Sequence, residues 1–235
     1  MKTISILTPV RKRPDNIRRM IKSIKDTMSY ETNIQLIYRA DETDELINNP
    51  DFMAECFLNI DERLYIHFLI GPETFPDLGC LWNECLEGCT GDIMQIGGDD
   101  LVYETKNWDK KIADKAGTFQ DEVYLIWGAD AIHNQTLATH GFVSRKWIET
   151  VGWFTPPCGL TYANDNFIHE IAARIGRHCF LGDVMIKHLW EGQNDADPNY
   201  HRMLTHFQRS NDFFYSEEGR KIIEEAAAKL RQIMN

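Results

Sequence analysis

The stretch IMQIGGDDLVY, residues 93–103, places two adjacent carboxylates, Asp99 and Asp100, directly after an apolar run. Such a run is typical of a buried strand, and Gly97 and Gly98 separate it from the acids. Two neighbouring like charges raise each other's pKa unless a positive charge lies beside them. A divalent cation such as Mg²⁺ or Mn²⁺ meets that need, because it binds one or two protein carboxylates together with the phosphate oxygens of a substrate. The alternative is an ordinary turn, since Gly and Asp are common turn residues.

Alternating strands and helices must position these acids. The apolar runs predict strands at residues 3–10, 33–41, 63–71 and 92–98, and one that ends near His188. Helical periodicity predicts helices at residues 15–28, 81–89, 166–175 and 216–234. Asp15 is the expected N-cap of the first helix, and Gly91 closes the second. Repeated strand–helix units with buried strands indicate an α/β fold with a mostly parallel sheet and right-handed crossovers.

Polar residues follow three of the predicted strands at their carboxyl ends. They are Thr8, Pro9, Arg11 and Arg13 after the first strand, Asp41, Glu42 and Asp44 after the second, and Asp99 and Asp100 after the fourth. Ligands of open parallel sheets bind at this edge. Gly97 and Gly98 lack side chains, so a bulky ligand can approach the backbone beside the acids. We therefore predict one shared site rather than three unrelated surface loops.

Composition restricts the setting of this site. The chain has 235 residues and 43% hydrophobic content, which is enough for a substantial core. Its net charge of −11 gives no strong sign of non-specific nucleic-acid binding, although a basic segment lies at residues 11–14. No apolar run approaches the roughly 18 residues that a membrane-spanning helix needs, and the N-terminus does not resemble a secretory signal. We expect no integral membrane segment and a cytoplasmic location.

The six cysteines include no CxxC pair, and we expect them to be reduced. Cys80, Cys85 and Cys89 are close in sequence, which leaves a metal cluster as one alternative. The segment also has helical character, and thiols commonly fill protein cores. The core interpretation is favoured.

The order of these motifs resembles the GT-A glycosyltransferases that use nucleotide sugars, in particular the large family 2 type. The likeness spans residues 3–190 and rests on the segments SILTPVRKRPDNIRRMIKSI, YRADETDE, GDIMQIGGDD and GLTYANDNFIHEIAARIG. It implies a GT-A, Rossmann-like α/β fold with a mostly parallel central sheet flanked by helices and a C-terminal helical extension. It also implies a nucleotide-sugar-binding half at 1–104, an acceptor-binding half of the same domain at 105–192, and a flexible loop and C-terminal helix at 193–235.

The resemblance implies a metal site. Asp99 and Asp100 occupy the place of the family's DxD-type motif, and Asp100 is the carboxylate expected to hold Mn²⁺ or Mg²⁺. Gly98 stands where many members carry the first Asp of that motif. His188 follows an apolar strand where the family often has a histidine metal ligand, the alternative being a structural histidine.

Other positions correspond to the nucleotide site. Thr8 and Pro9 match the first-strand loop that packs against the base, and Asp41 matches the second-strand acid that hydrogen-bonds the base or ribose. Asn83 matches the asparagine at the start of the helix before the metal strand; the alternative is a helix amide bonded locally. The same nucleotide-sugar-binding set includes Arg11, Arg13, Gly98 and Asp99.

On the acceptor side, the pair Asn164–Asp165 matches the acidic pair that opens a helix in the family, and Asp165 is the expected general base. The alternative is an N-cap for the helix at 166–175. Both roles are compatible if Asn164 caps the helix while Asp165 faces the pocket.

The resemblance thus implies a metal-dependent hexosyltransferase. A nucleoside-diphosphate sugar, with a UDP-sugar favoured, would donate its sugar to the hydroxyl of a saccharide, a protein, a lipid head group or a modified nucleic-acid base. Direct displacement would invert the anomeric configuration. The segment 191–203 is expected to be a mobile loop over the donor or a plain linker. A nucleotidyltransferase and a non-catalytic nucleotide-sugar-binding module stay open as alternatives.

Overall fold

The computed structural model describes residues 1–75, 77–189 and 204–234. Its strands are β1 (Lys2–Val10), β2 (Thr32–Asp41), β3 (Leu64–Gly71), β4 (Ile93–Ile96), β5 (Leu101–Tyr103), β6 (Leu125–Ala129), β7 (Phe142–Ser144) and β8 (His178–His188). Its helices are α1 (Pro14–Thr27), α2 (Pro50–Phe57), α3 (Leu78–Glu84), α4 (Trp108–Ala116), α5 (Arg145–Val151), α6 (Asn164–Ile175), α8 (Phe207–Tyr215) and α9 (Glu217–Arg231), with 3₁₀ turns η1 (Cys85–Gly88) and η2 (Asn134–Thr136). The expected loop at 191–203 lies outside the described residues.

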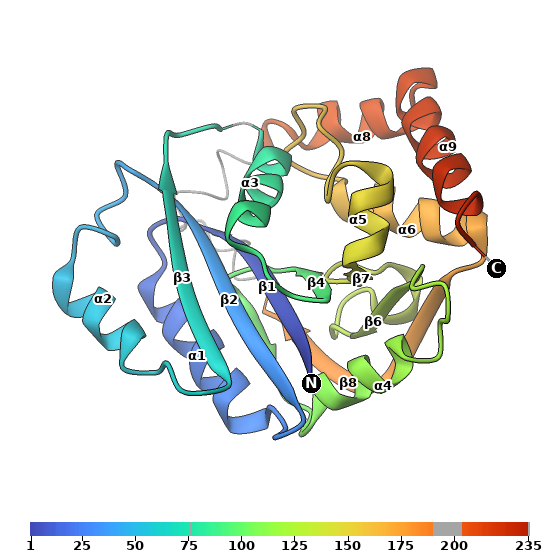
Figure 1. The fold of residues 1–235 in the computed structure, drawn as a ribbon. Helices are drawn as coiled ribbons and strands as arrows, with labels where there is room; N and C mark the ends of the chain where they lie inside the picture. Colours follow the sequence, from blue (N-terminus) through green and yellow to red (C-terminus); the bar gives the residue numbers. More distant parts are fainter. Residues whose placement is uncertain (76, 190–203, 235) are drawn as a thin grey trace.

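All the described strands belong to one sheet with the order β3-β2-β1-β4-β7-β6-β8-β5 (Figure 1). The pairs β1–β2, β2–β3, β1–β4 and β6–β8 are parallel. The pairs β4–β7, β6–β7 and β5–β8 are antiparallel. The mostly parallel α/β sheet predicted from the sequence is therefore confirmed, and it continues from the first half of the chain into the second through β4 and β7.

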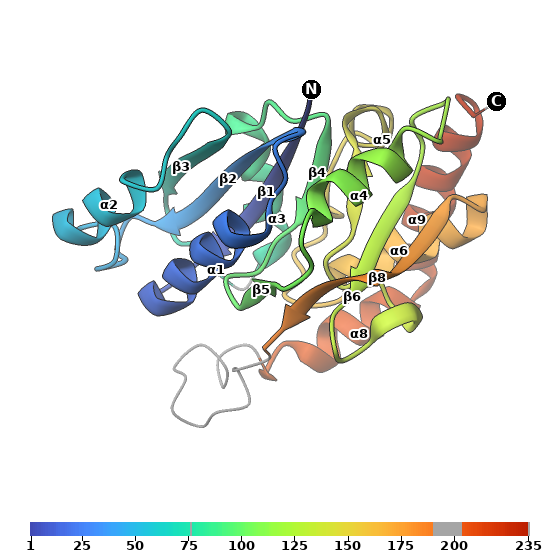
Figure 2. The same ribbon diagram turned by 90° about the horizontal axis from the view of Figure 1, so that it is seen from below.

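Helices cover both faces of the sheet (Figures 1 and 2). Alternate residues of β1 serve the two layers, since Ile4 and Ile6 pack with α1, α2 and α4, whereas Leu7 packs with α5, α6 and α9. Cys85 and Cys89 are buried in the second layer, in agreement with the core interpretation. None of the described helices combines the length and the apolar character needed to cross a bilayer.

Two of the expected helix starts need correction. Pro14 is the first residue of α1, and no side chain caps this helix. Asp15 is instead exposed and pairs with Arg18 at 2.8 Å, so the expected cap is wrong. α3 begins before residue 81 because Asp77 caps it, its side chain accepting a hydrogen bond of 3.0 Å from the N–H of Cys80.

Candidate active site at the carboxyl ends of the strands

The acid at the end of β2 is paired with two arginines. Asp41 has a side chain only 10% exposed, and its Oδ2 is ion-paired with Nη1 of Arg11 from the loop after β1. Nη1 of the buried Arg39 lies 3.6 Å from the other carboxylate oxygen. Arg11 also lies 3.3 Å from a carboxylate oxygen of Glu73. Of the predicted site residues, the structure thus brings Arg11 and Asp41 into direct contact.

The basic loop that joins β1 to α1 is held by acids from two other strands. Nη1 of Arg13 lies 3.1 Å from Oδ1 of Asp99, whose side chain is almost fully buried. Lys12 has a left-handed backbone with a φ of 54°, and its N–H donates to Oδ2 of Asp44 at 2.8 Å. This loop therefore folds onto the sheet edge and keeps its two guanidinium groups beside the acids.

Strand pairing brings Asp100 and His188 together. β5 follows Asp100 and pairs with β8 so that Leu101 lies opposite His188. Nε2 of His188 lies 3.2 Å from Oδ2 of Asp100. Burial acts to raise the pKa of Asp100, but the hydrogen bond and charge of His188 outweigh it and hold this pKa at about 2. Burial acts to lower the pKa of His188, but the same carboxylate raises it above its ordinary value.

This pair suits a divalent cation. A carboxylate oxygen and an imidazole nitrogen stand close together on paired strands, and Mn²⁺ or Mg²⁺ commonly takes few protein ligands and fills its other positions with phosphate oxygens. In the described parts of the chain, no three His, Cys, Asp or Glu side chains already form a metal cluster. Asp100 and His188 could therefore serve as two ligands of the cation, and a bound diphosphate would supply others.

A further imidazole, His140, packs against this pair. The ring centroids of His140 and His188 lie 4.7 Å apart with perpendicular planes. Nδ1 of His140 lies 3.1 Å from the carbonyl oxygen of Ile96 at the end of β4. Burial, together with the charge of the neighbouring His188, lowers the pKa of His140 to about 4, so the ring is neutral at pH 7. The sequence patterns did not predict this residue, because a single histidine between two strands carries no recognisable spacing.

Asp165 lies in the first turn of α6 and does not cap this helix. The N-cap is Ala163, with a left-handed φ of 67°, and no side chain accepts a capping hydrogen bond there. The N-cap alternative is therefore wrong for both Asn164 and Asp165. Oδ1 of Asp165 accepts a hydrogen bond of 3.0 Å from the N–H of Asn166. Burial raises the pKa of Asp165. This N–H and the charges of His133 and His188 oppose the rise, and the resulting pKa is about 6.

A buried acid, Asp130, connects the turn at residues 132–134 to the end of β8. Its Oδ1 accepts hydrogen bonds from the backbone of the 132–134 turn, including 2.8 Å from the N–H of His133. Its Oδ2 accepts from Thr139 at 2.8 Å, and its carbonyl accepts from the N–H of His188 at 2.9 Å. Asp130 therefore fixes the turn that carries His133 and the end of the strand that carries His188.

The two glycines before the acids allow close packing within the protein. A Cβ at Gly97 would lie 2.7 Å from the carbonyl oxygen of Leu7 and would also collide with Oγ1 of Thr8. Thr8 is fully buried beneath this turn, and the neighbouring Pro9 is partly buried in β1. The space beside Gly97 is thus filled by the first strand rather than left for a ligand. Contact of Thr8 and Pro9 with a nucleotide base stays a prediction.

Asn83 joins α3 to the loop before α6. Its Oδ1 accepts from the N–H groups of Phe154 and Thr155 at 2.8 and 3.1 Å, and its Nδ2 donates to the carbonyl of Thr155 at 2.9 Å. Two bonds through Gly79 reinforce the junction, at 2.5 Å from Thr155 Oγ1 and 3.1 Å to the carbonyl of Leu160. A direct contact of Asn83 with a donor stays a prediction, whereas its hydrogen bonds to Phe154 and Thr155, which are distant in sequence, are part of the fold.

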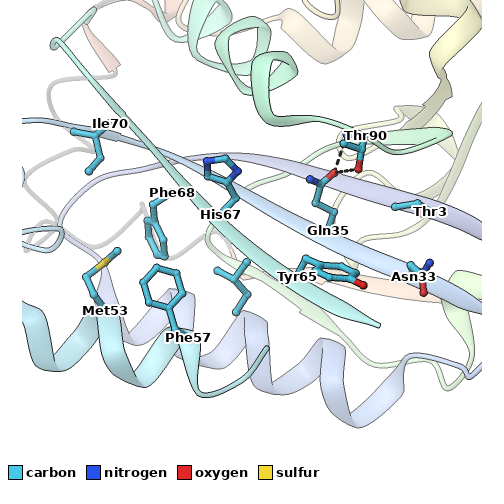
Figure 3. A pocket seen from close by; sticks show the side chains of 11 residues that line it. Thr3, Asn33, Gln35, Met53, Phe57, Tyr65, His67, Phe68, Ile70 and Thr90 are labelled. Atoms are coloured by element: carbon cyan, nitrogen blue, oxygen red, sulfur yellow. Dashed lines mark hydrogen bonds between the residues drawn. The ribbon is translucent and has the colours of Figure 1, made fainter. Parts of the chain in front are cut away.

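Two open grooves lie away from Asp41, Asp99 and Asp100. One of about 710 Å³ is lined mainly by the amino-terminal ends of β1 and β2, by the edge strand β3 and by α2 (Figure 3). It contains none of the predicted site residues. The second, of about 610 Å³, is lined mainly by α6, α8 and α9, with Asn166, Glu170, Arg174 and Tyr215 among its side chains, and Asp165 does not line it.

Comparison with solved structures identifies the fold. S. aureus TarS residues 1–349 in complex with UDP-GlcNAc align with 100% of this chain and 82% of the TarS chain, at 14% identity and a TM-score of 0.58. The same protein in complex with UDP gives 99% and 81% coverage, 16% identity and a TM-score of 0.59. The mannosyltransferase PcManGT from Pyrobaculum calidifontis, in complex with GDP-Man and Mn²⁺, gives 99% and 73% coverage, 12% identity and a TM-score of 0.67.

These likenesses extend over the whole chain, and they show that it has the fold of the GT-A glycosyltransferases. At such low sequence identity, the fold is what the comparison shows. Comparison of the sequence with protein-family models gives no match, and comparison with curated proteins gives none either.

The junction at Asn83 leads to a prediction about stability. Asn83→Ala should lower the free energy of unfolding by about 2–3 kcal/mol in urea denaturation, because two backbone N–H groups lose their acceptor. Asn83→Asp keeps an acceptor oxygen and should lose clearly less. If Asn83→Ala unfolds within about 0.5 kcal/mol of the wild type, the junction does not hold the loop.

Proposed function

We propose that this chain is a metal-dependent glycosyltransferase that moves a sugar from a nucleoside-diphosphate sugar to an acceptor hydroxyl. The observation that carries the proposal is the 3.2 Å contact between Asp100 and His188 at the sheet edge of a GT-A fold. The pKa of Asp100 is held at about 2, that of Asp165 is raised to about 6, and both interact with His188. Carboxylates separated in this way are suited to different tasks, one as a permanent anion and one as a proton acceptor near neutral pH.

The donor is proposed to bind along the ends of β1, β2 and β4. Arg11 and Arg13 carry the positive charge that a diphosphate requires, and Asp41 is the expected partner of the base or ribose. Asp100 and His188 would hold Mn²⁺ or Mg²⁺, which when bound neutralises the departing diphosphate. The similar structures of TarS and PcManGT are complexes with UDP, UDP-GlcNAc or GDP-Man. A donor screen should therefore include UDP-sugars and GDP-sugars, with UDP-sugars first.

Asp165 is proposed to take the proton of the acceptor hydroxyl. The oxygen would then attack the anomeric carbon from the face opposite the diphosphate, which inverts the configuration. General-base assistance of this kind contributes about 10² to 10⁴ in rate. The groove lined by α6, α8 and α9 is the proposed acceptor site, because it contains Asn166, the residue after Asp165 in α6, and offers charged and aromatic side chains.

Metal-dependent donor binding can be tested at Asp100. Asp100→Ala should lower the Mn²⁺-dependent affinity for UDP or GDP by more than about tenfold in calorimetry, because a first ligand of the cation is lost. Glu104→Ala removes an exposed acid at the end of β5 and serves as the matched control. Equal affinities for wild type and Asp100→Ala would contradict the metal assignment.

The role of Asp41 can be tested without metal. Asp41→Ala should weaken UDP or GDP binding in EDTA by about tenfold, since a contact with the base or ribose does not depend on the cation. The neighbouring Glu42→Ala, which removes an exposed side chain, should bind as the wild type does. If the affinities of Asp41→Ala and wild type agree in EDTA, Asp41 serves only as the partner of the two arginines.

The general base can be tested before the acceptor is known. Asp165→Asn keeps the size of the side chain but removes the proton acceptor, so kcat for transfer, or for hydrolysis of the sugar nucleotide by water, should fall by about 10² or more with little change in donor binding. The wild-type rate should rise with pH through a midpoint of about 6, where the Asp165 carboxyl loses its proton. A variant that hydrolyses its donor at the wild-type rate would rule out this role.

The same carboxyl should leave a mark on stability. Because its pKa is raised from 3.8 to about 6 in the folded state, the folded protein binds the proton more tightly than the unfolded chain. The Asp165 carboxyl should therefore contribute a fall in stability of about 1–2 kcal/mol as pH rises from about 4 to 6, as expected for a partly buried group, whereas the lowered pKa of His140 contributes a rise over the same range. Asp165→Asn should lack this fall in urea denaturation at pH 4.5 and 7.5. A variant that is strongly destabilised at both pH values would indicate a structural role instead.

A further inference from the structure

The place of the missing acid at Gly98 is taken by other side chains. Gly98 does not have a left-handed backbone, so its conformation does not require glycine. A Cβ there would lie 2.9 Å from Oδ1 of Asp100 and 3.4 Å from Cε1 of His140. A side chain at this position would therefore displace the Asp100 carboxylate and press against the His140 ring. An imidazole from the loop before β7 thus stands beside the position where an acid side chain would begin.

The hydrogen bond of His140 defines its tautomer. Nδ1 lies 3.1 Å from the carbonyl oxygen of Ile96, and because a carbonyl only accepts, Nδ1 carries the proton. The lone pair of the neutral ring is then on Nε2. This atom is buried and has no hydrogen-bond partner within the described part of the chain. A buried acceptor without a partner is unfavourable, so a ligand or cation would be needed to complete it.

The backbone around His140 fixes where this lone pair lies. Nε2 of Gln95 donates to the carbonyl of His140 at 3.1 Å, and the N–H of Ile96 donates to the carbonyl of Gly141 at the same distance. Both contacts tie the residue to β4, the strand that leads to Asp100. The ring is thereby held against His188, whose Nε2 contacts the Asp100 carboxylate.

We infer that His140 is a third protein ligand of the divalent cation held by Asp100 and His188, with Nε2 as the ligating atom. The inference rests on the proposed metal dependence. The groups do not yet form a cluster in the described residues, so the cation would have to replace the 3.2 Å contact between Asp100 and His188 and draw the three groups around it. Two imidazoles and one carboxylate favour Mn²⁺, Co²⁺ or Zn²⁺ over Mg²⁺, which prefers oxygen ligands.

The test measures binding of the metal itself. His140→Phe keeps a ring that can pack against His188 but has no lone pair, and it should bind Mn²⁺, with UDP present, at least about tenfold more weakly than wild type. The matched control is His67→Phe, in the groove of Figure 3, which should bind as wild type does. Wild type should prefer Mn²⁺ to Mg²⁺ by about tenfold or more. Wild-type Mn²⁺ affinity in His140→Phe would overturn the inference.

A second measurement needs no substitution. In wild-type protein with ¹⁵N-labelled histidine, titration with Zn²⁺ should shift the ring nitrogens of both His140 and His188, whereas a shift of His188 alone would overturn the inference. Mn²⁺-dependent UDP-sugar binding that survives His140→Phe would overturn the third ligand but not the proposed function. Zn²⁺ bound through His140 in a protein that binds no sugar nucleotide would support the third ligand and overturn the proposed function.

Discussion

The site depends on the pairing of each acid at the sheet edge with its own positively charged side chain. The ends of β2 and β4 bring Asp41, Asp99 and Asp100 to the same edge of the sheet, and nearly buried carboxylates there would repel one another without partners. Arg11 and Arg39 neutralise the first, Arg13 the second and His188 the third. The adjacent acids of the GGDD segment therefore have separate partners, Arg13 for Asp99 and His188 for Asp100. In the proposed function, a diphosphate and a metal ion would bind by exchange of these partners, which would keep the local charge balanced.

Much of the fold could be predicted because the first half of the chain consists of continuous apolar strands between clear turn residues. The predictions for β1, β2 and β3 agree with the structure to within about one residue, since buried parallel strands leave unbroken apolar runs. The short strands β5 and β7, of three residues each, were not predicted because so few residues carry no usable periodicity. Their positions are set by pairing with β8, β4 and β6, which is a property of the folded sheet.

For the site, sequence patterns indicated which strand ends meet but not which side chains touch. The contact of Asp100 with His188 follows from the pairing of β5 with β8, and only the resemblance to the glycosyltransferases had suggested that these two residues share a site. His140 could not be predicted in the same way, because its importance comes from a carbonyl of β4 and a ring of β8 that approach it only in the folded chain. The expected cap at Asn164 failed because Ala163 enters α6 with a left-handed backbone, a conformation that sequence patterns rarely indicate for alanine.

Asn83 has a consequence for the size of the substrates. Its side chain joins α3 by hydrogen bonds to the loop that leads to Asp165. Gly79, in the same helix, makes further hydrogen bonds to this loop. These hydrogen bonds therefore help to set the separation between the ends of the parallel strands and the Asp165 carboxylate. In the proposed reaction, this separation would exclude a donor whose reactive carbon lies too near to the strand ends or too far from them. Discrimination between sugar donors would then depend on the length of the donor, in addition to any contact between side chains and the hydroxyl groups of the sugar.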